Sequence, residues 1–139
     1  MHLRTKLDMK LIGYITTFET LTHAHVKDLF VDELGILIFV VKEGDSGKAI
    51  GKQGIHIKKM SYLFKKNIKV IEYNTDVATF IKNIIYPLTP DTIDIHDDTI
   101  LVKVADVSVR AKLIGRNRRN LNQLNTLVEK YFHSHVKVA

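Results

Sequence analysis

One residue pattern occurs twice in this chain of 139 residues, and the two copies lie 64 positions apart. The matched pairs include Ile36 and Ile100, Lys48 and Lys112, Ile50 and Ile114, Gly51 and Gly115, Ile57 and Leu121, and Met60 and Leu124. A repeat of this length can bury a core of its own, so it predicts a duplicated small domain rather than a solenoid. We therefore expect two domains, residues 1–73 and 74–139, which no Pro- or Gly-rich linker separates.

Hydrophobic spacing predicts the same order of elements in each copy: a helix, two strands, two helices around a short loop, and a closing strand. For the first copy we expect a helix at 6–20 with Thr5 as its N-cap, strands at 24–31, 36–41 and 68–71, and helices flanking residues 51–54. For the second copy we expect a helix at 76–86, strands at 92–95, 99–104 and 136–139, and helices flanking residues 115–118. The predicted class is α+β, with each copy a three-stranded sheet covered by helices.

Basic residues are concentrated in the parts of the chain that contain the two loops. The formal net charge is +6. Residues 42–72 hold eight Lys or Arg against three Asp or Glu, and residues 99–139 hold eight against two. Residues 73–98, in contrast, are acidic. Basic residues that served only solubility would be spread along the whole chain. Their concentration in two segments therefore favours a polyanionic partner.

The loop at residues 51–54 has the sequence Gly-Lys-Gln-Gly and lies between two predicted helices. Glycines lack a Cβ atom, so they allow a tight turn and a close approach of a sugar-phosphate strand to the backbone. The helix that follows points its N-terminal N–H groups and positive dipole end toward a phosphate there. Lys52 adds a mobile charge and Gln53 a neutral donor, while Ile50 can wall an apolar groove for unstacked bases.

These residues resemble the KH module. Its signature is an apolar residue, a GxxG loop, and an apolar residue three positions after the second glycine, and Ile50, Gly51, Gly54 and Ile57 satisfy it. The helix and strand ahead of the core are similar to the type II arrangement. The resemblance implies two tandem type II KH domains, each with a helix-GxxG-helix loop, that bind single-stranded RNA.

The second loop is similar but departs from the motif, because Arg118 occupies the position of the second glycine. Its side chain could narrow the approach to the backbone, and the arginines could instead hold phosphates electrostatically. From the loop chemistry and the resemblance together, the predicted RNA-binding residues are Lys48, Ile50, Gly51, Lys52, Gln53, Gly54, Ile57 and Lys58 in the first copy, and Lys112, Ile114, Gly115, Arg116, Asn117, Arg118 and Arg119 in the second.

Two adjacent KH modules in a chain of this size resemble the archaeal NusA-like transcription factors, and residues 38–54 are especially similar to that family. The resemblance covers residues 5–139. It implies a non-enzymatic role in regulating transcription elongation or termination, with the nascent transcript as RNA partner and RNA polymerase as a second partner. The open alternatives are a KH protein of ribosome assembly or RNA processing, and a protein-interaction or enzymatic domain in which the glycine loops are only turns.

Other chemistry is disfavoured by the sequence. The absence of cysteine excludes thiol nucleophiles, disulfides and Cys-based metal sites. Neither Gly-Lys pair is followed by the Ser or Thr of a P-loop. We interpret the His pairs at 23/25 and 133/135 and the aspartates at 94, 97 and 98 as surface groups, and His56 as a candidate RNA contact. We expect no catalytic residue, no metal and no cofactor.

The 11 aromatic residues mostly lie in apolar runs or on helical stripes, so we expect them in the core rather than on a base-stacking surface. The longest apolar run, residues 36–41, is far shorter than a membrane span. The first ten residues lack the apolar stretch of a secretion signal. We therefore expect a cytoplasmic monomer with no membrane partner.

Overall fold

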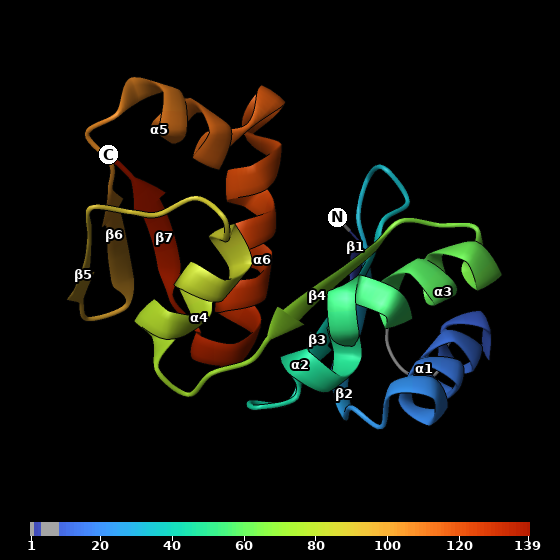
Figure 1. Ribbon diagram of the computed structural model, residues 1–139. Helices are drawn as coiled ribbons and strands as arrows, with labels where there is room; N and C mark the ends of the chain where they lie inside the picture. Colours follow the sequence, from blue (N-terminus) through green and yellow to red (C-terminus); the bar gives the residue numbers. More distant parts are fainter. Residues whose placement is uncertain (1, 4–8) are drawn as a thin grey trace. The chain divides into compact units, whose positions relative to one another are not determined.

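The computed structural model describes residues 2–3 and 9–139, and the chain divides into two compact units, Met1–Asn74 and Thr75–Ala139 (Figure 1). The first unit consists of β1 (His2–Leu3), α1 (Met9–Thr22), β2 (Val26–Val31), β3 (Leu37–Val41), α2 (Ser46–Ile50), α3 (Ile55–Phe64) and β4 (Ile68–Glu72). The second unit consists of α4 (Val77–Ile85), β5 (Thr92–His96), β6 (Thr99–Lys103), α5 (Val107–Ile114), α6 (Arg119–Phe132) and β7 (His135–Val138). Both units follow the order of elements predicted from the repeat, and the fold class is α+β.

The first sheet has one more strand than predicted. Its order is β1-β2-β3-β4, with β2 antiparallel and β4 parallel to the central strand β3. The additional strand is the two-residue β1, in which His2 pairs with Val31 of β2. The second sheet has the three predicted strands in the order β5-β6-β7, again with an antiparallel and a parallel neighbour of the central strand.

The core of the first unit lies between its helices and one face of its sheet. The cluster consists of Leu11, Ile15 and Phe18 of α1, Ala24 just before β2, Val26 and Leu29 of β2, alternate residues of β3, Ala49 of α2 and Met60 of α3. The Phe18 and Phe39 rings stack with their centroids 4.1 Å apart. All five residues of β3 are buried, which agrees with the unbroken apolar run that predicted this strand.

Helix α1 ends two residues later than predicted, and α2 begins without a side-chain cap. Helix α1 extends to Thr22, whose hydroxyl donates to the carbonyl of Phe18 and accepts from the Ala24 N–H. The left-handed conformation of His23 then ends the helix. Thr5, its predicted N-cap, and residues 6–8 lie outside the described residues. Asp45 is placed at the N-cap of α2, but its carboxylate accepts from the His25 N–H at 2.8 Å instead.

Each glycine loop lies in the connection between two parallel strands. A chain that continues from one parallel strand to the next must return along the sheet, and α2 and α3 make that return between β3 and β4. Helices α5 and α6 do the same between β6 and β7. Buried residues on both sides of each loop, such as Leu113 and Leu121 in the second unit, fix the loop at the surface. In the described residues, no helix is both long and apolar enough to cross a membrane.

Candidate nucleic-acid interface

The first loop, residues 51–54, reverses the chain between α2 and α3 through three residues with positive φ. Gly51 has φ 76° and ψ 171°, Gln53 has φ 55° and ψ 27°, and Gly54 has φ 73° and ψ 20°. Positive φ disfavours residues with a Cβ atom, so the two glycines relieve strain at two of these positions. The loop is therefore a tight turn whose residues are exposed or half-buried.

The second loop, residues 115–118, has the same backbone conformation although it lacks the second glycine. Gly115 has φ 74° and ψ 169°, Asn117 has φ 55° and ψ 30°, and Arg118 has φ 61° and ψ 21°. Arg118 thus adopts the left-handed conformation of Gly54, at a backbone cost of about 1 kcal/mol. A Cβ atom added to Gly54 would meet nothing within 4 Å, so an arginine fits this turn sterically. The departure from GxxG changes the surface of the loop and not its shape.

A hydrogen bond across each loop joins the ends of its two helices. His56 Nδ1 lies 2.8 Å from the carbonyl oxygen of Lys48, and Asn120 Nδ2 donates to the carbonyl oxygen of Lys112 over 2.8 Å. Because a carbonyl oxygen only accepts, His56 carries its hydrogen on Nδ1. We call this bond the helix clasp. The sequence analysis interpreted His56 as an RNA contact and did not find this hydrogen bond. Asn120, which occupies the equivalent position in the second copy, is also a hydrogen-bond donor.

The helix clasp explains the first glycine of each loop. A Cβ atom on Gly51 would lie 2.8 Å from His56 Nδ1, and one on Gly115 would lie 2.8 Å from Asn120 Cγ. Such distances are shorter than van der Waals contact, so any larger residue must displace the clasp side chain. The first glycine therefore provides space for the clasp as well as conformational freedom, whereas Gly54 provides conformational freedom alone.

The helices that begin at the two loops have no side-chain cap. No side chain accepts from the first N–H groups of α3 or α6. By contrast, Asp76 caps α4 by accepting from Thr79, and Asp106 caps α5 by accepting from Ser108 and Val109. The bonds from Thr79 hold the pKa of the Asp76 carboxyl below its ordinary value. The N-terminal dipole ends of α3 and α6 therefore have no carboxylate cap that competes with an incoming phosphate.

The structure gathers the predicted site residues around their loops and places none of them in the core. The exposed ones are Lys48, Ile50, Lys52, Gln53 and Lys58 in the first unit and Lys112, Arg116, Asn117 and Arg118 in the second. The half-buried ones are Gly51, Gly54, Ile57, Ile114, Gly115 and Arg119. Arg119 differs from its arginine neighbours because its Nε is buried. Its guanidinium is accordingly less accessible than those of Arg116 and Arg118.

A cavity of about 330 Å³ opens beside the second loop. Ile114, Arg118 and Leu121 line it on the helix side, and residues 135–138 of β7 line it on the sheet side. Its walls combine apolar side chains with the cations Arg118 and Lys137. Ile114 aligns with Ile50, the residue from which the sequence predicted an apolar groove in the first copy.

Three of the histidines and aspartates interpreted as surface groups, His25, Asp94 and His135, form local side-chain contacts. His25 Nδ1 lies 3.7 Å from Glu19 Oε2, and His135 Nδ1 lies 3.4 Å from Glu129 Oε1. Asp94 forms an ion pair with Lys103 at 3.1 Å. Over residues 2–3 and 9–139, no three His, Asp or Glu side chains are grouped to hold a metal ion.

Comparison with known proteins gives one family match and several related chains. Residues 12–104 match the sequence profile described as "KH domain". The "Probable transcription termination protein NusA" of Methanococcus vannielii is 36% identical over 124 residues, which span 87% of this chain and 71% of that protein. The protein of the same name from Methanocaldococcus jannaschii is 28% identical over 131 residues, spanning 92% and 71%. The crystal structure of APE1850 has a TM-score of 0.73 at 28% identity, covering 92% of this chain and 96% of that one.

Proposed function

The chain belongs to the KH domain family and to the NusA-like proteins of archaea. From this premise we propose that it binds single-stranded RNA and thereby regulates transcription elongation or termination. In this proposal the chain catalyses no reaction. In this proposal residues 1–73 and 74–139 are each one type II KH domain. The order helix-strand-strand-helix-helix-strand in both units supports that assignment. The family match at 12–104 includes all of the first loop and ends before the second.

The observation that carries the proposal is that two loops of different sequence share one backbone conformation. Gly54 and Arg118 differ completely in side chain, yet their φ and ψ values agree within about 12° and 1°. Neither loop is required to hold the core, because the residues of each loop are exposed or half-buried. A shared surface geometry that tolerates strain at Arg118 favours a binding role over a mere turn.

The loop chemistry supports a single-stranded polyanion. KH loops clamp about four nucleotides of backbone. Residues 46–71 contain seven lysines and no Asp or Glu, and Arg116 and Arg118 are exposed at the second loop. The cavity at the second loop offers an apolar surface for a base next to a cation for a phosphate. Both loops can therefore contribute to one strand or bind separate strands.

The names of the related proteins favour transcription over ribosome assembly or RNA processing, which remain the second candidate. In the proposal the RNA is a nascent transcript, RNA polymerase is the protein partner, and the chain acts as a monomer. Affinity purification from cells distinguishes the two processes. Recovery with RNA polymerase supports the proposal, whereas recovery with ribosomal subunits supports the alternative.

The direct test replaces both exposed residues between the first pair of glycines with aspartate. We expect Lys52→Asp with Gln53→Asp to abolish binding of a fluorescent single-stranded RNA in an anisotropy titration without unfolding the protein. Lys82→Asp with Thr89→Asp is the matched control, because it changes the charge equally at exposed positions of the second unit. Full affinity in the loop variant, or equal losses in the two variants, would contradict a specific role of the loop.

A further inference from the structure

The outer face of α3 places an exposed tyrosine between two pairs of lysines. The Tyr62 side chain is 81% exposed, the largest fraction among the exposed tyrosines of the described chain. Lys58 and Lys59 precede it by one helical turn, and Lys65 and Lys66 follow the last residue of the helix. We call these five residues the Tyr62 face. Tyr62 departs from the expectation that the aromatic residues lie mainly in the core.

The helical period explains why Tyr62 points outward. Met60 is fully buried and Phe64 packs on Tyr14 with a ring distance of 4.6 Å, so both face the core. At about 100° per residue, Tyr62 lies roughly 200° from either of them around the helix axis. Its ring therefore adds little to the packing of the first unit, and its exposure needs another explanation.

The Tyr62 face is cationic without compensation. None of its four lysines forms an ion pair with another described residue. Lys69, the next lysine along the chain, differs from these four because it is partly buried. Burial lowers the pKa of Lys69, and the nearby charge of Asp32 raises it to a smaller extent. Four uncompensated cations within nine residues attract a polyanion.

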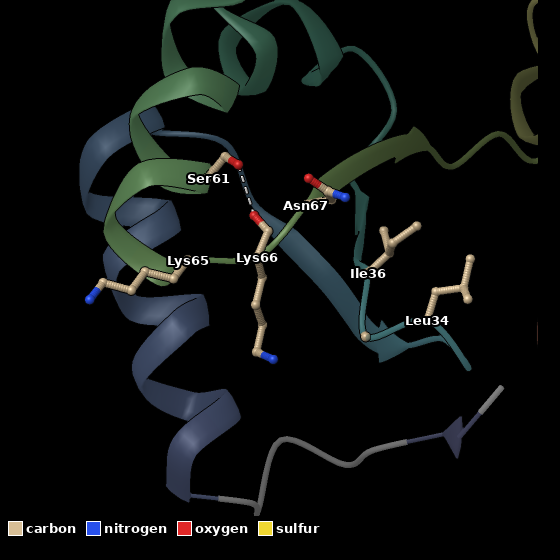
Figure 2. A pocket seen from close by; sticks show the side chains of 7 residues that line it. Leu34, Ile36, Ser61, Lys65, Lys66 and Asn67 are labelled. Atoms are coloured by element: carbon tan, nitrogen blue, oxygen red, sulfur yellow. Dashed lines mark hydrogen bonds between the residues drawn. The ribbon is translucent and has the colours of Figure 1, made fainter.

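A hollow lies at the far end of the Tyr62 face (Figure 2). Its volume is about 330 Å³, and it is lined by Leu34, Gly35, Ile36, Ser61, Lys65, Lys66 and Asn67. The Ser61 hydroxyl donates to the Lys66 carbonyl at 2.9 Å, which fixes the backbone here. Figure 2 shows the Lys66 side chain between the end of α3 and the turn at Leu34, while the Lys65 side chain points away. The hollow thus offers a polar, cationic end point for a strand that passes Tyr62.

We propose that the Tyr62 face binds the part of the RNA strand that extends beyond the first loop, with a base stacked on Tyr62 and phosphates at the lysine pairs. This inference rests on the proposed function. Tyr62 lies eight residues after Gly54, about 12 Å along the same helix at 1.5 Å per residue. A strand longer than the four or so nucleotides held by a KH loop must leave the loop, and α3 is the element that starts there.

The composition of the face favours RNA over an acidic protein. Any base can stack on an exposed aromatic ring, and flanking cations follow the backbone, which is the usual combination for single strands. A protein interface would have a contiguous apolar centre, but here only Leu63 accompanies Tyr62 as an exposed apolar residue between the lysine pairs. An acidic protein partner is the competing interpretation, and it would remain if the substitutions at Tyr62 left the affinity for both RNAs unchanged.

The test compares a short RNA of about four nucleotides, which fills the loop, with one of about ten nucleotides. We expect Tyr62→Ala to weaken the longer RNA about 5- to 10-fold in anisotropy titrations and to leave the short RNA unchanged. Tyr62→Phe should retain full affinity for both, because it keeps the ring. Tyr86→Ala is the matched control, since Tyr86 is 77% exposed but lies in the second unit.

A second test addresses the lysines. Lys65→Gln with Lys66→Gln should reduce the slope of log affinity against log salt by about 1.4 for the longer RNA only.

The outcomes separate this inference from the proposed function. If Lys52→Asp with Gln53→Asp abolishes binding of both RNAs while Tyr62→Ala changes neither, the Tyr62 face is not an RNA site and the loop function stands. Equal weakening of short and long RNA by Tyr62→Ala also overturns the inference, because the effect would then act through the loop. Binding of neither RNA by the unmodified protein would overturn the proposed function itself.

Discussion

The Nδ1 atom of His56 lies 2.8 Å from the carbonyl oxygen of Lys48 and joins the end of α2 to the start of α3. The bond recurs in the second unit between Asn120 and Lys112, with an amide in place of the imidazole. Two side chains of different chemistry therefore perform the same structural task at equivalent positions. We therefore expect the turn to depend on this bond as well as on its glycines.

We expect His56→Ala to lower the free energy of unfolding of the first unit by about 1 kcal/mol, because the helix clasp is lost. RNA affinity should fall with it, since the loop loses its fixed geometry. His56→Asn copies the second unit and should retain most of both properties. Urea denaturation followed by circular dichroism, with anisotropy titrations on the same samples, measures these effects. Equal behaviour of the Ala and Asn variants would show that the clasp has no energetic role.

The two glycines of the first loop should respond differently to alanine. Gly54→Ala only forces a Cβ atom into a left-handed conformation, at about 1 kcal/mol. Gly51→Ala places a Cβ atom at φ 76° and ψ 171°, a region that only glycine adopts readily, and it also displaces the His56 ring. We therefore expect a larger loss, of about 2 to 3 kcal/mol. In a double-mutant cycle, Gly51→Ala and His56→Ala should be non-additive because both break the helix clasp. Strict additivity in urea denaturation would contradict this coupling.

The second loop should contribute to RNA binding through its exposed arginines. We expect Arg116→Ala with Arg118→Ala to weaken binding and to reduce the slope of log affinity against log salt by about 1.4, the value for two single-strand phosphate contacts. Adding Arg119→Ala should change the slope less than the substitution of either exposed arginine does, because the Nε of Arg119 is buried. Anisotropy titrations over a salt series measure the slope. An unchanged slope would mean that the second loop does not contact the strand.

Acid stability should depend on the N-cap of α4. Hydrogen bonds from Thr79 lower the folded-state pKa of Asp76 below its ordinary 3.8, so the charged cap stabilises the fold fully above that pH. The stabilisation is lost as the pH falls through the lowered value. Asp76→Asn keeps a cap that does not titrate. Thermal melts from about pH 6 to pH 2 should show the wild-type advantage over this variant shrinking below about pH 4. Parallel curves would contradict the assignment.

The repeat and the hydrophobic spacing predicted most of the fold, because the burial of apolar side chains determines both the sequence pattern and the positions of the helices and strands. Residues 37–41 of the predicted run form the fully buried β3, and glycines lie at several of the turns. The left-handed conformation of Arg118 could not be predicted from residue type, because arginine rarely adopts it, whereas Asn117 belongs to a residue type that adopts it more often. The pairing of β1 with β2 was missed, since two residues are too few to show a periodic pattern.

The surface of the site was only partly predictable. Loop charge and glycine spacing indicated the residues that gather around each turn, but the helix clasp depends on two atoms eight residues apart and leaves no periodic signal. The exposure of Tyr62 could have been found from the spacing of Met60 and Phe64, which together assign the inner face of α3.

The most direct test of the central claim is a two-dimensional NMR titration of the isotope-labelled chain with a short single-stranded RNA. We predict that the largest amide shifts lie at residues 51–54 and 115–118 and that the hairpin formed by β5 and β6 shows no shifts. Shifts concentrated on that acidic hairpin, with both loops unaffected, would contradict RNA binding by the glycine loops.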